Sequence, residues 1–294
     1  MHIALDPGHI GGRWAKMEER WYQIGGGIPV QEGDMALRVA ALVKPMLEDL
    51  GARVSLVRDK TEPASEKRPE DFDALAREQL ADYAGGDLEF RVRKLREQLF
   101  YRAWEIRARA DLINGTLRPD LCVCLHFNAE AWGDPARPAF VPANHFHILM
   151  NGCYSLGEFN LDDNRFAAMH RLLQGIPDEE IAAAGPMAAA FERHTGMPPY
   201  VYTKPTARTV DGNPYLYARN LLANRVYRCP VIFLEPYVMN NGEVYNRIQL
   251  GDYEGLKPVN GRAQPSIFRE YAAAVAEGLR DYYAAARGGE GGAR

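Results

Sequence analysis

The sequence predicts an α/β fold built on a mostly parallel sheet. Short apolar runs typical of buried strands alternate with longer segments of helical periodicity along the 294-residue chain. The order strand, helix, strand at 2–6, 32–51 and 52–58 is typical of a βαβ unit with a right-handed crossover. The alternation continues without an internal repeat, so we expect one domain, residues 1–286, followed by a flexible glycine-rich tail, residues 287–294.

The first elements are recognised by the residues that end them. HIALD (2–6) is an apolar strand stopped by Pro-Gly, and the glycine-rich segment 13–31 is expected to form a loop. Residues 32–51 carry apolar side chains at helical spacing and end at a glycine, although Pro45 is expected to kink or split this helix. The alternating segment 52–58 is then a strand.

The middle of the chain departs from this simple order. Residues 60–87 are charged and are expected to leave the core, and residues 88–113 are expected to form a long helix rich in Arg, Glu, Leu and Ala. Two strands follow. The apolar run 120–129 reads as a buried strand, and 143–152 alternates between apolar and polar residues.

The C-terminal part returns to helices and one strong strand. Segments 164–176 and 179–196 have helical patterns, whereas 197–220 predicts a loop followed by the start of a helix. CPVIFLEPY (229–237) is the last strong strand, and 265–286 has clear helical periodicity.

Composition limits the classes of partner. The net charge of −4 and the charged fraction of 25% leave no basic field for nucleic acid. A hydrophobic content of 47% is enough for a sizeable core, but no apolar run reaches the roughly 18 residues of a transmembrane helix. The first residues run directly into a strand, so we expect no signal peptide in this chain, and cellular location and oligomeric state stay open.

Functional side chains follow the predicted strands at the points where these end. His9, His126 and Glu235 each stand at or just after the end of an apolar run. In open α/β sheets, sites form at the carboxyl ends of the strands, so these three side chains are expected to converge. Glu32 joins them because it begins the helix that follows the first strand and therefore lies at the same edge.

Two histidines and a carboxylate make a suitable open zinc site. Zinc takes four near-tetrahedral ligands, and a catalytic site leaves the fourth position to water, whose pKa falls towards about 7. A second carboxylate, here Glu235, can take the proton and pass it to a leaving nitrogen. Two histidines and two glutamates at one sheet edge therefore suit a metal-assisted amide hydrolase, although their spacing matches no compact motif such as HExxH. Each of the four residues also has an ordinary interpretation. These are, in chain order, a loop histidine for His9, a helix-start residue favoured by the dipole for Glu32, a strand-end hydrogen-bonding group for His126 and a salt-bridge partner for Glu235.

At this point the sequence resembles the zinc-dependent N-acetylmuramoyl-L-alanine amidases of the Amidase_3 type. Four segments resemble blocks of that family and occur in the family's order: IALDPGHIGG, EGDMALRVAALVKPMLEDLGARVSLVR, the stretch from RARADLIN to RPDLCVCLHFNA, and CPVIFLEPYVMNNGEV. The chain departs from the family at several positions. Ile10 separates the histidine from the glycine pair, Ala36 stands where an Asn is common, and Cys124 stands where relatives have Ser.

The resemblance implies a fold, a site and a reaction. The fold is a three-layer α/β/α domain with the zinc site at the carboxyl ends of the strands. Zinc is bound by His9, Glu32 and His126, and Glu235 is the general base and acid. The substrate is peptidoglycan or a muropeptide, cleaved between N-acetylmuramic acid and L-alanine. The family usually acts outside the cytoplasmic membrane. Compared with the family domain, the extra length falls near 60–100 and 155–225.

Three further residues are candidates for supporting or substrate-binding roles. Asp6 could accept the other N–H of a ligand histidine, or it could only shape the Asp-Pro-Gly turn. Arg58 could orient Glu32 or bind a substrate carboxylate, or it could be a surface cation. Asn128 could hydrogen-bond near the metal, or it could form a turn.

Other residues compete with this interpretation. His145 and His147 share one face of a strand and are rival metal ligands, with a polar strand face as the alternative. Cys122 and Cys124 are separated by one residue, which suits neither a CxxC metal knuckle nor an easy disulfide, so we expect buried free thiols. Aromatic residues in or beside loops, such as Tyr202, could line a substrate groove.

Two alternative functions remain open from the sequence. One keeps the fold and the zinc but acts on a non-wall peptide or acyl amide. The other is a non-catalytic module that binds the cell wall.

Overall fold

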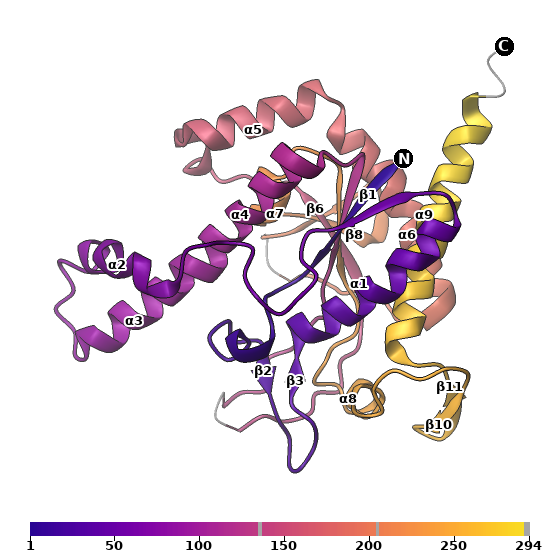
Figure 1. The fold of residues 1–294 in the computed structure, drawn as a ribbon, viewed down its shortest axis with the longest axis horizontal. Coiled ribbons are helices and arrows are strands. Elements are labelled where there is room, and N and C mark those ends of the chain that lie inside the picture. Colours follow the sequence, from indigo (N-terminus) through magenta and orange to yellow (C-terminus); the bar gives the residue numbers. More distant parts are fainter. Residues whose placement is uncertain (135–136, 204–205, 291–294) are drawn as a thin grey trace.

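A seven-stranded sheet forms the centre of the molecule in a computed structural model that describes residues 1–134, 137–203 and 206–290 (Figure 1). The strands follow the spatial order β4-β1-β5-β9-β6-β8-β7. Their bounds are β1 His2–Pro7, β4 Arg53–Leu56, β5 Leu121–Leu125, β6 His147–Asn151, β7 Arg208–Val210, β8 Asn213–Arg219 and β9 Val231–Glu235.

The strand directions confirm the prediction of a mostly parallel sheet. The four strands β4, β1, β5 and β9 run parallel to one another. β6 is antiparallel to β9 and parallel to β8, and β7 is antiparallel to β8. The carboxyl ends of β1, β5 and β9 therefore meet at one edge, where the sequence places His9, His126 and Glu235.

Helices cover both faces of the sheet and make it a three-layer α/β/α fold, as predicted (Figure 1). Ile3 and Leu5 of β1 face one core cluster, with Val39 of α1 and Val275 of α9. Ala4, between them, faces a second cluster on the other side, formed with α4 and α7. The helices are α1 Glu32–Asp49, α2 Asp73–Gln79, α3 Leu88–Gln98, α4 Glu105–Asp111, α5 Asp162–Leu173, α6 Ile176–Thr195, α7 Leu222–Val226, α8 Gly242–Gln249 and α9 Ile267–Glu290.

The predicted excursion from the core is a helical hairpin. Figure 1 shows α2 and α3 projecting away from the sheet. From α3 the chain stays helical through the π-helical turns η3 (Leu99–Trp104), then α4, and then η4 (Leu112–Leu117). The long helix predicted over 88–113 is therefore present. Its outer part is distant from the sheet, whereas α4 packs on it.

The segment 197–220 corrects the sequence prediction. Residues 197–203 form no helix or strand apart from an isolated bridge at Pro199, in agreement with the predicted loop. In place of the predicted helix start, the segment contains the antiparallel strands β7 and β8, and the short helix α7 begins only at Leu222. The connection is Asp211-Gly212, and both residues have positive φ, of 53° and 67°. Asp-Gly with two left-handed residues is the signature of a tight hairpin turn, and it outweighs the helical pattern of the residues that follow.

Smaller differences from the prediction concern element ends. The segment 13–31 holds the 3₁₀ turn η1 (Gly12–Trp14) and a short hairpin of β2 (Trp21–Tyr22) and β3 (Val30–Gln31). Helix α1 continues through Pro45 and is not split. Helix α9 continues to Glu290, and residues 291–294 of the predicted tail lie outside the described residues. The remaining short elements are η2 Pro69–Phe72, η5 Glu158–Asn160, β10 Lys257–Val259 and β11 Arg262–Gln264.

Within the described part of the chain, no helix is both long and apolar enough to span a membrane.

Candidate metal and catalytic site

The structure brings together the three side chains predicted as metal ligands. Each of His9, Glu32 and His126 offers a ligand atom, and these atoms all lie within 4.8 Å of one another. Nε2 of His9 is 3.3 Å from Oε2 of Glu32, and Nδ1 of His126 is 3.0 Å from Oε1 of the same carboxylate. The two imidazole rings meet edge to face, with centroids 5.1 Å apart. This cluster could hold one metal ion.

The Asp-Pro-Gly-His turn places His9 and makes room for His126. The amide of Gly8 donates to the carbonyl of Leu125, so the turn stays paired with β5 beyond the end of β1. A Cβ at Gly8 would lie 2.3 Å from Cε1 of His126, so only glycine leaves space for this ring. The ring of His126 is held on its other side by stacking on Phe233, with centroids 4.3 Å apart.

Two buried arginines hold the backbone of His9. This residue has a φ of 56°, a left-handed conformation that is unfavourable outside glycine and needs support from its surroundings. Two hydrogen bonds to the His9 carbonyl provide this support, one donated by Nη2 of Arg58 at 2.5 Å and one by Nη2 of Arg109 at 2.9 Å. Arg58 is thus buried beneath the turn, and its interpretation as a surface cation is wrong.

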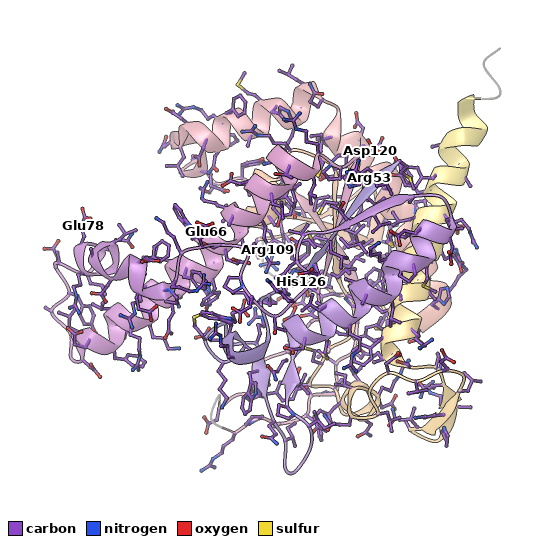
Figure 2. All side chains as sticks on the ribbon, viewed as in Figure 1. Arg53, Glu66, Glu78, Arg109, Asp120 and His126 are labelled. Atoms are coloured by element: carbon purple, nitrogen blue, oxygen red, sulfur yellow. The ribbon has the colours of Figure 1, made fainter. Side chains whose placement is uncertain are left out.

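Asp6 acts on the turn through Arg109. Its carboxylate accepts from Nη1 of Arg109 at 2.9 Å and from the hydroxyl of Tyr227 at 2.6 Å, and Arg109 also pairs with Glu105 at 2.9 Å. The Asp6 side chain therefore holds the arginine that holds His9. Among the residues that the structure describes, it makes no hydrogen bond to a ring nitrogen of His9 or His126. Figure 2 shows Arg109 and His126 near each other, at the opposite end of the sheet from Arg53 and Asp120.

Glu18 supports His9 and was not found from the sequence. Its carboxylate lies 3.6 Å from Nδ1 of His9 and accepts hydrogen bonds from the amides of Ile10 and Gly11. Burial raises the pKa of Glu18, but His9 and the two amides lower it by more, so the group is ionised. Glu18 lies in an irregular segment, where no periodic pattern distinguishes it from the neighbouring Glu19.

Ile10, which separates His9 from the glycine pair, anchors the turn to the two segments that flank the projecting hairpin. Its side chain is fully buried and packs in a separate apolar cluster with Phe72, Phe100 and Tyr101. The loop that carries His9 is thereby tied to η2 and η3.

Glu32 is the anionic centre of the site. It is buried at the first position of α1, and its Oε1 also accepts from the amide of Phe127 at 3.2 Å. Burial raises the pKa of this carboxyl, but His9, His126 and Arg20 lower it to about 2. Glu32 is therefore a carboxylate at every pH at which the protein would work.

Arg20 lies against two of the predicted ligands and was missed by the sequence analysis. Its Nε lies 3.2 Å from Nε2 of His9 and 3.2 Å from Oε2 of Glu32. The residue comes from the loop just before β2, where nothing in the pattern marks it. Its guanidinium therefore offsets part of the negative charge of Glu32.

Glu235 ends β9 on the same edge and has the properties of an acid–base group. It is half-buried and lines a cavity of about 490 Å³ together with His9 and His126. Burial and then the nearby carboxylate of Glu32 raise the pKa of Glu235 to about 8. Its carboxyl group can therefore both release and accept a proton near neutral pH.

The remaining candidates lie outside the ligand cluster. The amide of Asn128 is 3.5 Å from Nδ1 of His145, and its oxygen accepts from the amide of Ala129. His145 pairs with Glu130 at 3.0 Å, and Nε2 of His147 lies 3.1 Å from the hydroxyl of Tyr202. In the part of the chain that the structure describes, the histidine pair does not belong to a group that could hold a metal.

The cysteines are free thiols. Cys122, Cys124 and Cys229 are buried, and Cys153 is partly exposed. Three of the four thiols therefore agree with the expectation of buried free cysteines.

Comparisons with known proteins were made for the sequence and for the fold. No protein-family model and no curated sequence matches the chain. Several solved structures, in contrast, match the fold of the chain. The CwlD amidase of Clostridioides difficile, solved in complex with the GerS lipoprotein, is similar with a TM-score of 0.53, 10% identity, and coverage of 97% of this chain and 98% of that one.

Two further structures give the same result. The apo form of the N-acetylmuramyl-L-alanine amidase Ami1 from Mycobacterium abscessus has a TM-score of 0.51 and 17% identity over 96% of this chain and 98% of that one. The catalytic domain of CwlV, an N-acetylmuramoyl-L-alanine amidase from Bacillus (Paenibacillus) polymyxa var. colistinus, has a TM-score of 0.51 and 14% identity over 97% and 98%. At these identities the likeness concerns the fold. The chain therefore has the fold of the N-acetylmuramoyl-L-alanine amidases.

Proposed function

We propose that this protein is a zinc-dependent amidase that cleaves the bond between N-acetylmuramic acid and L-alanine in peptidoglycan or its fragments. The observation that supports this most is the convergence of His9, Glu32 and His126 within 4.8 Å, with Glu235 lining the same cavity. The shared fold with known amidases and the four sequence segments point to the same reaction. In this proposal residues 1–286 act as one catalytic domain.

The donor atoms suit zinc. Two imidazole nitrogens and one carboxylate oxygen are ligands that zinc accepts, and three protein ligands leave one position open. The negative charge that a metal ion needs comes from the buried, ionised carboxylate of Glu32. His9, Glu32 and His126 would hold the ion. When bound, zinc supplies a Lewis acid that polarises the amide carbonyl and makes water more acidic.

The chain's own residues provide the proton transfers. Glu235 takes a proton from the attacking water at a carboxylate oxygen and donates it to the amide nitrogen of the departing alanine. Burial and the carboxylate of Glu32 raise the pKa of Glu235, so its carboxyl group retains a proton at higher pH than an exposed glutamate does. The half-buried position of Glu235 keeps its carboxyl group partly out of bulk water, which strengthens its interaction with the reacting groups.

Supporting residues keep the geometry fixed. Arg58 and Arg109 hold the carbonyl of His9, Glu18 lies against its ring, and Gly8 leaves the space that His126 fills. Precise placement of ligands by such partners is commonly worth 10- to 100-fold in metal affinity or activity, roughly.

Mass spectrometry of digested peptidoglycan tests the proposal. We expect purified sacculi to release stem peptides that begin with a free L-alanine amino group, and we expect chelation to abolish the release and zinc to restore it. Cleavage of other amides with no release from sacculi or muropeptides would favour the non-wall hydrolase. Binding to sacculi without any release, at full zinc occupancy, would favour the binding module.

A further inference from the structure

The catalytic cavity contains one arginine whose charge is not neutralised by a neighbouring carboxylate. Besides Glu235, the cavity is lined by Arg20, Arg102, Arg109 and Arg219. The first three pair with Glu32, Glu19 and Asp6 respectively. Among the described residues, Arg219 has no carboxylate within ion-pair distance.

Arg219 is nevertheless held in place. Its Nη1 lies 3.2 Å from the hydroxyl oxygen of Tyr202, and its guanidinium carbon is 5.5 Å from the centre of the Tyr202 ring. The same hydroxyl is 3.1 Å from Nε2 of His147. The hydroxyl oxygen of Tyr202 can therefore accept a hydrogen bond from Arg219 while its O–H donates a hydrogen bond to His147.

His147 is suited to accept that proton. It is 3% exposed, and burial, His145 and Arg219 lower its pKa to about 3, so the ring is neutral. This explains the burial of a histidine that the sequence offered as a rival metal ligand. Its role is to fix a tyrosine, and through the tyrosine the arginine.

The guanidinium retains unused hydrogen-bonding capacity. An arginine carries five N–H donors in a planar fork that matches a carboxylate. Nε of Arg219 is buried without a hydrogen-bond partner among the described residues, although one Nη is used by Tyr202. Nη2 likewise makes no hydrogen bond to a described residue, so the guanidinium keeps a donor of its fork for an acceptor that a ligand supplies.

The sheet places Arg219 on the same face as Glu235. His147 is the cross-strand partner of Glu235, and Leu149 is paired both with Phe233 of β9 and with Tyr217 of β8. Alternate residues of a strand share a face, so Tyr217 and Arg219 face the same side as Phe233 and Glu235. The positive charge of Arg219 is among those that lower the pKa of Glu235, which places it within electrostatic range.

We propose that Arg219, positioned by Tyr202 and His147, binds a carboxylate on the peptide side of the scissile amide. This inference rests on the proposed amidase function and specifies its substrate. On the sugar side of that amide, the lactyl carboxyl group is itself bonded to the alanine nitrogen, so this side has no free carboxylate. The peptide side carries carboxylates on the residues after alanine. A cation that lines the same cavity as the acid–base group therefore selects stem peptides whose next residue is an unamidated acid.

A matched pair of substrates tests this: N-acetylmuramoyl-L-alanyl-D-glutamate and its diamide, compared by kcat/KM. For the wild type we expect a preference for the free acid of about tenfold or more, mainly through KM, as for a charged hydrogen bond. In Arg219→Gln the ratio should fall towards one. Arg219→Lys, which keeps the charge without the fork, and Tyr202→Phe should give intermediate ratios. Arg102→Gln removes another cavity cation, but one already paired with Glu19, and should keep the wild-type ratio.

Several results would overturn the inference: a wild-type ratio near one, a ratio unchanged in Arg219→Gln, or an equal loss in Arg102→Gln. Calorimetric binding of L-alanyl-D-glutamate and its diamide to the wild type gives a readout without turnover. Tighter binding of the free acid is expected, and equal binding overturns the inference even if Arg219→Gln does not fold. If neither muramoyl substrate is cleaved, the amidase proposal fails, while the binding comparison still decides the role of Arg219.

Discussion

Gly8 and His126 are in such close contact that the glycine has no room for a side chain. A Cβ at Gly8 would lie 2.3 Å from Cε1, 2.4 Å from Nδ1 and 2.5 Å from Nε2 of the imidazole. Real Cβ atoms do not approach a ring this closely. The turn after the first strand and the ring of His126 are thus complementary in shape, although they are more than a hundred residues apart in the chain.

Replacing Gly8 by alanine should therefore weaken metal binding without removing a ligand. The methyl group displaces the ring of His126 from Glu32, and displacements of this kind cost about 10- to 100-fold in affinity. Competition with a chromogenic chelator measures the change. The matched control is Gly26→Ala, where an added Cβ meets nothing within 4 Å. Equal zinc affinity in the two variants would show that the contact does not position His126.

Replacing Glu235 by glutamine should remove catalysis and leave the metal in place. The amide cannot exchange a proton at its oxygen, so we expect kcat to fall about 10²- to 10⁴-fold. Muropeptide hydrolysis gives the rate, and elemental analysis gives the zinc content. Glu254→Gln is the control, because the Glu254 side chain is 85% exposed and its ion-pair partner in the described part of the chain is Arg269. Substantial activity in the Glu235 variant would reject its assignment as general base and acid.

Replacing Arg109 by methionine should destabilise the protein strongly. The side chain is 5% exposed and pairs with two buried carboxylates, Asp6 and Glu105, which would be left without their cation. Such a loss costs about 3–5 kcal/mol of unfolding free energy, measurable by urea denaturation. The control is Arg107→Met, two residues away, which breaks an exposed ion pair with Asp163 in which the arginine side chain is 43% exposed. It should lower the unfolding free energy by at most about 1 kcal/mol. Similar losses in both variants would contradict the buried network.

Acid should weaken the fold through His147. Burial lowers its pKa from 6.5 to about 3 in the folded state, so between these values only the unfolded chain binds the proton. The stability it provides is complete above pH 6.5 and is lost as the pH falls towards 3. At pH 5 this loss is about 2 kcal/mol. His147→Gln should therefore lose less unfolding free energy than the wild type between pH 7 and pH 5. If the two proteins had the same pH dependence, His147 would bind its proton equally well in the folded and the unfolded chain.

The order of strands and helices could be predicted because it depends on local patterns. Apolar runs that end in His9, His126 and Glu235 indicate parallel strands, and parallel strands bring their carboxyl ends together. Glu32 followed from its place at the start of a helix after the first strand. These residues are found from topology alone, without knowledge of any side-chain contact.

The supporting residues could not be predicted, because their contacts join segments that are distant or irregular. Arg109 reaches the turn of His9 only through the way α4 packs on the sheet. Glu18 and Arg20 come from a loop whose path no periodicity defines. The β7–β8 hairpin was missed for another reason: its Asp-Gly turn was present in the sequence, and a helical interpretation of the residues after it was preferred.

The most direct test of the account is a crystal structure of the zinc-loaded protein, with diffraction data collected on both sides of the zinc absorption edge. We expect one anomalous peak, about 2.0–2.2 Å from a nitrogen of His9, a nitrogen of His126 and an oxygen of Glu32. We also expect the carboxyl group of Glu235 to face the peak without coordinating it. A peak coordinated by His145 and His147, or an active protein with no zinc at the three residues, would contradict the account.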